Sequence, residues 1–286
     1  MKKLLLVALL LAPGMAEART ILFVGNSFTF GAGSAAHYYK SETVTDLNPP
    51  DTKGRTVGGV PAIFKSFTKQ AGLDYDVSLE TVGGKGMDFH FAEKIPLLDK
   101  PWDVVVMHGY STLDQANPGN PALLVTSAKQ MTDMFRAKNA QAEVWLTATW
   151  SRADQTYPAG KPWSGKPIQQ MGKDIAAGYA LAAKDAKATG IVPVGLAWNR
   201  AMETGVADDN PYDGIAPGKI DLWTHDSYHA SAYGYYLEAL LVFGRVTGKD
   251  PLSLGETETV AEDLGFSKTQ TKALQQIAHD ELAASR

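Results

Sequence analysis

Short apolar runs that alternate with helix-like segments are the feature that most constrains how this chain folds. The apolar runs span residues 20–25, 75–82, 102–107, 143–148 and 191–194. The first, Thr-Ile-Leu-Phe-Val-Gly, is apolar at nearly every position, which is typical of a strand buried on both faces. Between and after these runs lie helix-like segments at 61–71, 89–98, 122–137, 168–189, 233–247 and 268–284.

This alternation predicts an α/β domain, a three-layer α/β/α sandwich with a mainly parallel five-stranded sheet. In such sheets, functional residues gather at the carboxyl ends of the strands. The segments that follow the first three runs are Asn26-Ser27-Phe28-Thr29, Gly83-Gly84-Lys85-Gly86 and His108-Gly109-Tyr110-Ser111. Two further stretches, 40–59 and 151–167, are predicted as loops, which either serve the site or decorate the surface.

The first eighteen residues have the layout of a secretory signal peptide. Lys2 and Lys3 precede an apolar run at 4–11, and Ala16-Glu17-Ala18 has the pattern of a cleavage site. A buried first strand or helix is the alternative, but these flanking residues favour export to the periplasm or the medium. Cleavage after residue 18 leaves 19–286, or 286 − 18 = 268 residues, as a single domain. The run is too short to span a bilayer, so no stable membrane anchor is expected.

Composition excludes several classes of function. The chain has 27 Lys and Arg against 31 Asp and Glu, so it lacks the basic excess of a nucleic-acid-binding protein. It contains no cysteine, which excludes disulfides, thiolate metal sites and a cysteine nucleophile. No cofactor is predicted, and the sequence carries no signal for the oligomeric state.

Ser27 is a candidate nucleophile because it directly follows a predicted buried strand, in Gly25-Asn26-Ser27. A serine hydroxyl needs a base, and His229 with Asp226 three residues before it can supply one. The carboxylate would accept from one imidazole nitrogen and leave the other free to take the serine proton. His225 is a competing base, but its adjacency to Asp226 gives a poorer geometry. The alternatives are that Ser27 caps a turn and that Asp226 caps the following helix.

Taken together, these segments resemble the SGNH (GDSL-like) hydrolase superfamily, as a divergent member. The resemblance is carried by Gly25-Asn26-Ser27-Phe28-Thr29, the glycine-rich segment after the second run, and Asp226-x-x-His229 followed by Ala-Ser-Ala-Tyr-Gly-Tyr. It implies a flavodoxin-like sandwich and a Ser27–His229–Asp226 triad that hydrolyses esters. It also implies an oxyanion hole made of the backbone N–H groups of Ser27 and Gly84, with Gly83 or Gly86 as substitutes for Gly84.

The third segment departs from the family pattern. The family usually has Gly-x-Asn-Asp there, with the asparagine as a side-chain oxyanion donor, whereas this chain has His108-Gly109-Tyr110-Ser111. Counted from the strand end, Tyr110 falls nearest the asparagine position. Either the Tyr110 hydroxyl or the His108 imidazole could donate instead. A tyrosine packed at the strand end is the alternative.

Four residues near this edge are expected to contact substrate: Asn26, His108, Trp150 and Trp163. Trp150 follows the fourth strand, and Trp163 lies in the 151–167 loop with Tyr157. Aromatic faces with polar neighbours suit sugar rings, although core or lid packing is the alternative for each tryptophan.

The predicted function is that of an exported serine esterase. The predicted substrate is a small-molecule or polysaccharide ester, with short acyl groups such as acetyl on carbohydrate. Lipase or thioesterase action is the alternative within the same class. A non-hydrolytic carbohydrate-binding or polymer-modifying protein on the same scaffold is the alternative outside it. A metal hydrolase using His225, Asp226 and His229, with His90 or His108, is weaker because the triad explains this segment without a metal.

Overall fold

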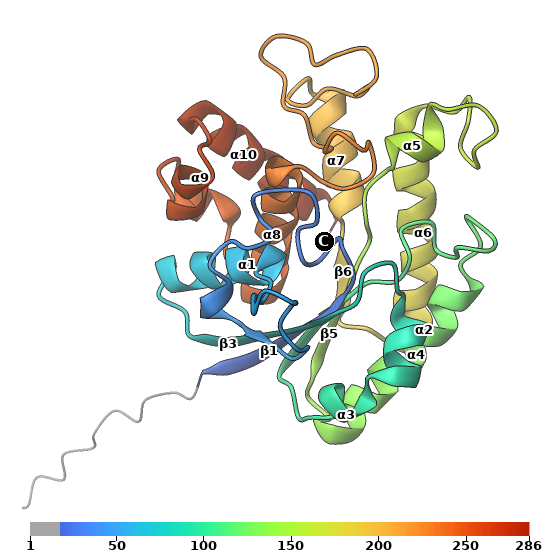
Figure 1. The fold of residues 1–286 in the computed structure, drawn as a ribbon, viewed down its shortest axis with the longest axis vertical. Coiled ribbons are helices and arrows are strands. Elements are labelled where there is room, and N and C mark those ends of the chain that lie inside the picture. The colour runs from blue at the N-terminus through green and yellow to red at the C-terminus, as the bar shows by residue number, and fades with distance from the viewer. Residues whose placement is uncertain (1–17, 286) are drawn as a thin grey trace, which may run out of the picture.

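The computed structural model describes residues 18–285 and shows a six-stranded, entirely parallel sheet with helices on both faces (Figure 1). The strand order is β2-β3-β1-β4-β5-β6. The strands are β1 (Arg19–Gly25), β2 (Thr45–Asp46), β3 (Tyr75–Thr81), β4 (Val104–Met107), β5 (Glu143–Thr147) and β6 (Gly190–Val192). The predicted three-layer α/β/α class is confirmed. The predicted signal peptide, residues 1–18, falls almost wholly outside the described residues.

The predicted strand count of five is wrong by one. The sixth strand, β2, lies in the 40–59 stretch that is predicted as a loop, and it pairs with β3 at the edge of the sheet. A strand of two residues is too short to show alternation or a sustained apolar run.

Side chains of β1 point alternately to two separate cores. Ile21 and Phe23 belong to the core shared with α1 (Gly59–Gln70), α7 (Val194–Glu203) and α8 (Ala232–Thr247). Leu22 and Val24 belong to the core shared with the second helical layer, α2 (Met87–Glu93), α4 (Ala122–Lys138) and α6 (Ile168–Ala186). Figure 1 shows α1 and α8 on one side of the sheet and α4 and α6 on the other. Because successive strand residues face opposite sides, a strand apolar at every position fits this arrangement.

Prolines explain two differences from the predicted elements. The predicted helix at 89–98 is split into α2 and α3 (Ile95–Leu98), since Pro96 cannot continue the hydrogen bonds of the preceding turn. The strand predicted to reach residue 194 ends at Val192, and α7 begins directly after Pro193. A proline removes a ladder donor and suits a helix start.

The remaining elements lie outside the sheet. They are the short helices α5 (Ala153–Thr156) and α9 (Thr259–Asp263), the single turns η1 (Ser41–Thr43) and η2 (Pro251–Leu254), and the C-terminal α10 (Lys268–Ala284). Ser267 begins α10 with a reciprocal capping pair to Gln270. Among residues 18–285, no helix is both long enough and apolar enough to cross a membrane.

Candidate functional site

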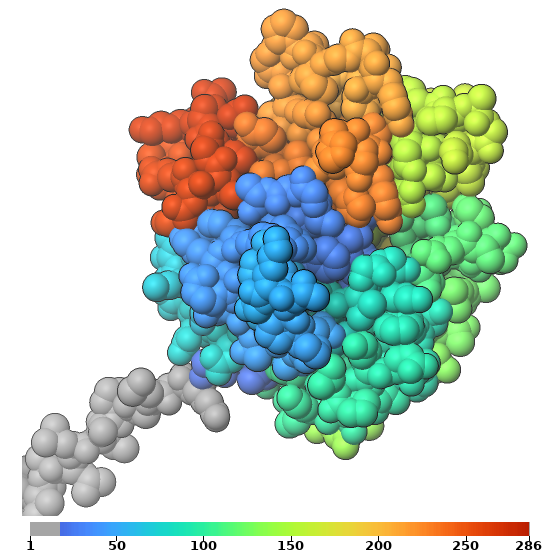
Figure 2. All heavy atoms as spheres, viewed as in Figure 1, coloured from blue at the N-terminus to red at the C-terminus, as the bar shows by residue number. Residues whose placement is uncertain are grey.

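The candidate site lies at the carboxyl end of β1, which is the point where the chain switches direction across the sheet. β1 pairs with β3 on one side and with β4 on the other, so the loops that leave these three strands border one place. Ser27 lies two residues beyond the end of β1, and only 7% of its surface is exposed. Figure 2 shows the blue segment that contains Ser27 meeting the teal and orange segments on one face of the molecule.

Asp226 and His229 form a hydrogen-bonded pair within one loop, before α8. The His229 Nδ1 donates to Asp226 Oδ2 at 2.6 Å. The other carboxylate oxygen, Oδ1, accepts from the Thr224 hydroxyl at 2.7 Å and from the backbone N–H groups of Tyr228 and His229 at 2.9 and 2.8 Å. Because a carboxylate only accepts, Nδ1 carries the imidazole proton and Nε2 is left as an acceptor.

The charge on Asp226 is stabilised by the same bonds. Partial burial opposes ionisation, but the hydrogen bonds from His229, Thr224 and the loop backbone outweigh it and hold the pKa of Asp226 well below its ordinary value. The carboxylate therefore stays ionised at neutral pH. This is the state that orients an imidazole as a base.

The loop that carries the pair is closed locally. The backbone N–H of Thr224 donates to the His229 carbonyl at 2.8 Å, and Trp223 and Ala230 form an isolated antiparallel bridge. Ser227 lies between them with φ of 57°, in the left-handed region. The sequence therefore builds the Asp226–His229 pair almost entirely from neighbouring residues.

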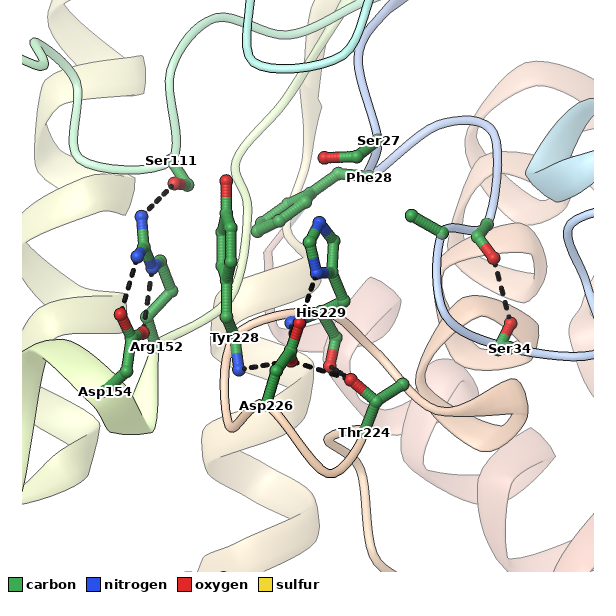
Figure 3. A network of polar contacts seen from close by, with 12 residues as sticks. Ser27, Phe28, Ser34, Ser111, Arg152, Asp154, Thr224, Asp226, Tyr228 and His229 are labelled. Carbon is green, nitrogen blue, oxygen red and sulfur yellow. Dashed lines mark hydrogen bonds and ion pairs between the residues drawn. The ribbon is translucent and has the colours of Figure 1, made fainter.

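Ser27 lies beside the open edge of this pair. In Figure 3 its side chain is next to the Nε2 edge of His229, while Nδ1 faces Asp226 on the opposite side. Phe28, the next residue, contacts the His229 ring with centroids 5.8 Å apart. The structure thus places Ser27 beside the hydrogen-bonded Asp226–His229 pair, and the roles of the three residues as a triad stay a prediction. Within residues 18–285, the Ser27 hydroxyl has no hydrogen-bond partner, and this includes His229.

A buried hydroxyl anchors the Ser27 turn to the helix that follows His229. Tyr235, in the first turns of α8, places its hydroxyl 3.2 Å from the carbonyl oxygens of Ser27 and of Ala32, and its one proton is shared between them. The Ala32 N–H also donates to the Ser27 carbonyl at 3.0 Å. This contact ties the Ser27 turn to the helix that follows the Asp226–His229 loop.

Gly84 lies in an exposed turn after β3 with φ of 71°, a conformation that favours glycine. Its carbonyl accepts from the Gln115 side chain at 3.2 Å. In the described part of the chain, the N–H groups of Gly84 and Ser27 have no hydrogen-bond partner. Both are available to a ligand, and their role as oxyanion donors stays a prediction.

His108 is not available to substrate, which corrects two predicted roles. It is 2% exposed, its Nδ1 donates to the Gly109 carbonyl at 3.0 Å, and its Nε2 accepts from the Thr29 hydroxyl at 2.7 Å. Burial lowers the pKa of His108 to about 4, so the ring is neutral and both nitrogens are occupied. His108 braces the turn after β1 instead of donating to an oxyanion.

Asn26 and Tyr110 are also engaged by the protein. The Asn26 amide donates to the Lys85 carbonyl at 2.8 Å, and its oxygen accepts from the Phe28 N–H at 3.1 Å. Asn26 therefore joins two loops of the site and is corrected from a substrate contact to a brace. Tyr110 packs its ring against Gly86, and its pKa is raised by burial and by the nearby Asp88 carboxylate. Tyr110 is therefore held toward α2.

Both tryptophans that are predicted to bind substrate are buried. Trp150 has no exposed surface and is stacked between Phe28, at 3.9 Å, and Trp198, at 4.9 Å between ring centroids. Trp163 is 2% exposed, and its indole N–H donates to Asp174 at 2.8 Å. Both tryptophans are therefore packing residues, as the alternative prediction had it. Trp150 contacts the candidate site through Phe28, on which it stacks.

The structure adds residues to the site that the motifs do not single out. Tyr228, between Asp226 and His229, stacks beside the His229 ring with centroids 4.1 Å apart. Arg152 lies 3.6 Å above the Tyr228 ring and is held by two bonds to Asp154. The only signal for Arg152 in the sequence was its position, because it follows β5 at the carboxyl edge of the sheet. Among the described residues, no three His, Asp or Glu side chains are grouped to hold a metal ion.

Comparison with known proteins identifies the fold but no close relative. No protein-family model and no curated protein matches the chain. A DUF4886 family protein from Bacteroides uniformis is similar with a TM-score of 0.60 and 16% identity, over 93% of this chain and 95% of its own. A protein from Slackia heliotrinireducens named "a putative SGNH hydrolase" is similar with a TM-score of 0.51 and 21% identity, over 80% and 100%.

A third similar structure, named "a putative GDSL-like lipase", comes from Parabacteroides merdae. Its TM-score is 0.52 with 13% identity, over 81% of this chain and 96% of its own. At these identities the likeness concerns the fold. The fold implied by the resemblance in the sequence is confirmed: the chain is folded as the SGNH and GDSL-like hydrolases among these structures are.

Proposed function

We propose that this chain is a serine esterase of the SGNH type, with Ser27 as nucleophile, His229 as base and Asp226 as its orienting partner. The observation that carries the proposal is the His229 ring, which donates from Nδ1 to Asp226 at 2.6 Å and has its Nε2 edge on the side of Ser27. A neutral imidazole in this tautomer is the state that can accept a serine proton.

In the proposed reaction, the Ser27 oxygen forms a bond to the ester carbonyl carbon while its proton passes to His229 Nε2. The carbonyl π electrons move to the oxygen, where the N–H groups of Ser27 and Gly84 stabilise the charge. When the carbonyl re-forms, the carbon–alkoxy bond breaks and the alcohol leaves with the proton from Nε2. Water, deprotonated by the same nitrogen, then releases the acid from the acyl-enzyme.

Ser27→Ala tests this assignment. We expect hydrolysis of a short-chain aryl ester, and covalent labelling by an aryl phosphonate, to disappear while the free energy of unfolding stays close to that of the wild type. Thr43→Ala, which removes an exposed hydroxyl on η1, is the control and should retain both activities. Hydrolysis or labelling that persists in Ser27→Ala would rule out Ser27 as the nucleophile.

We further propose that the substrate is a short acyl ester, such as acetyl, on carbohydrate, and that the chain is exported by its first eighteen residues. The aromatic pair Tyr157 and Tyr212 supports the first point: the two rings are 38% and 52% exposed, with centroids 5.7 Å apart. Exposed aromatic faces suit sugar rings. The buried Trp150 and Trp163 do not contribute.

A series of aryl esters with lengthening acyl chains, together with acetylated oligosaccharides, tests the substrate. We expect acetate to be released from the oligosaccharide, and activity to fall as the acyl chain grows. A preference for long chains would favour lipase action instead. Fractionating cells that express the chain with and without residues 1–18 tests export, and an intracellular full-length product would refute it.

A further inference from the structure

The proposed reaction leaves one role unfilled. Charge that develops on the ester oxygen can be met by two backbone N–H groups, and a side-chain donor would add a third bond. The three side chains that the sequence suggests near Ser27 are not free for this: Asn26 is bonded to Lys85, His108 is bonded at both nitrogens, and the Tyr110 hydroxyl is hydrogen-bonded with Asp88 and the Gly86 backbone.

Tyr228 lies where its hydroxyl can supply this third hydrogen bond. Its ring packs directly on the base, with centroids 4.1 Å from His229, and also on Phe28 at 5.3 Å. Figure 3 shows its hydroxyl end pointing the same way as the His229 ring, toward the level of the Ser27 side chain. Within residues 18–285, no hydrogen bond occupies the Tyr228 hydroxyl, so its proton is free to be donated.

Arg152 fixes the Tyr228 ring from the opposite face. The guanidinium carbon lies 3.6 Å from the ring centroid, and Asp154 holds the guanidinium by bonds of 2.9 and 2.6 Å. Trp150 adds an N–H bond to the Tyr228 carbonyl at 3.1 Å. A cation over the ring face is attracted to the π electrons, which helps to hold the ring in this position.

Ser111 is the rival donor. Its oxygen accepts from Arg152 Nη1 at 3.3 Å, which leaves its own proton free. Tyr228 is the better candidate because direct ring contacts set its position against both His229 and Phe28, the residue that follows Ser27.

We propose that Tyr228 is a catalytic residue of the esterase site, whose hydroxyl donates a hydrogen bond to the substrate carbonyl oxygen as that oxygen gains charge. The inference rests on the proposed function. No proton is transferred in this step: the phenol keeps its O–H bond, and the hydrogen bond strengthens as the Ser27–carbon bond forms.

Tyr228→Phe tests this, because it removes the hydroxyl and keeps the ring contacts. We expect kcat for a short-chain aryl ester to fall about 100-fold with little change in KM, as for the loss of one oxyanion donor. The rate of Ser27 phosphonylation by an aryl phosphonate should fall in parallel, since its phosphoryl oxygen occupies the same place. Tyr233→Phe, whose ring stacks on Phe266 outside the site, is the matched control and should behave as the wild type.

Each other outcome overturns the inference. Wild-type rates in a folded Tyr228→Phe protein would do so, as would a loss that appears in Ser111→Ala instead. A loss confined to alkyl esters with poor leaving groups would place Tyr228 on the departing alcohol. If the wild-type chain neither hydrolyses esters nor is labelled at Ser27, the proposed function fails and this inference with it; if it is labelled and Tyr228→Phe reacts equally fast, only this inference fails.

Discussion

Replacing Asp226 by asparagine separates the two tasks of this carboxylate. Its Oδ1 accepts three hydrogen bonds that shape the loop, and its Oδ2 accepts one, from His229 Nδ1 at 2.6 Å. An asparagine oxygen can keep the first three. Its amide nitrogen, in place of Oδ2, donates and so requires His229 Nδ1 to accept. The imidazole proton then moves to Nε2, and the ring can no longer take the proton of Ser27.

The expected effect is therefore large on activity and small on folding. Loss of the correct tautomer in a serine triad lowers kcat by about 10⁴-fold, or about 5 kcal/mol of transition-state stabilisation. The three retained loop bonds limit the change in the free energy of unfolding to about 1 kcal/mol. Asp226→Ala removes all four bonds, so it should lose the same activity and more stability.

The assay is hydrolysis of a short-chain aryl ester, alongside urea unfolding. Ser227→Gly, in the same loop, is the control: φ at 57° suits glycine, so we expect wild-type activity and no loss of stability. A folded Asp226→Asn protein that keeps more than about a tenth of the wild-type kcat would refute the tautomer reasoning, given the expected size of the effect.

Three further predictions follow from other contacts. The pKa of His108 is about 4 because it is buried, so between pH 6.5 and 4 the unfolded chain binds a proton that the folded chain does not. Urea unfolding should therefore show that about 3 kcal/mol of stability is lost as pH falls through this window. His108→Gln should flatten this dependence of stability on pH. Gly25→Ala places a Cβ 2.2 Å from the Thr29 hydroxyl and 2.5 Å from His108 Nε2, so it should cost about 1–3 kcal/mol and lower activity; a neutral effect in urea unfolding would contradict this. Chelator should leave ester hydrolysis unchanged, because His229 Nδ1 and Asp226 are bonded to each other; loss of activity that zinc restores would revive the metal hydrolase.

Elements with a long, uniform pattern could be predicted from the sequence. The five apolar runs form β1, β3, β4, β5 and β6. The long helices α4, α8 and α10 lie at the positions predicted for them. The predictions failed where a pattern was too short or was interrupted. The two-residue β2 has no periodicity, a proline interrupts the segment that forms α2 and α3, and another ends the strand before α7, a helix that the sequence did not predict.

For the site, spacing along the chain predicted the local pair better than the distant contacts. Asp226 and His229 are three residues apart and pair through their own loop, as expected. The role of His108 depends on Thr29, which lies far away in the sequence, so no local pattern reveals that both of its nitrogens are occupied. The same holds for Trp150: its position after β5 was correct, but its stacking between Phe28 and Trp198 depends on the assembled fold.

The bond between the Tyr235 hydroxyl and the Ser27 carbonyl has a consequence for how the proposed site assembles during folding. The Asp226–His229 pair forms from neighbours, whereas the Ser27 turn is joined to α8 by a contact that spans 208 residues. Closing so long a loop is entropically costly, so this contact forms only when the ends of the domain have come together. Under the proposed function, recovery of Ser27 reactivity during refolding would therefore report that Ser27 and α8 have come together, and a partly folded chain would hold the Asp226–His229 pair without Ser27 beside it.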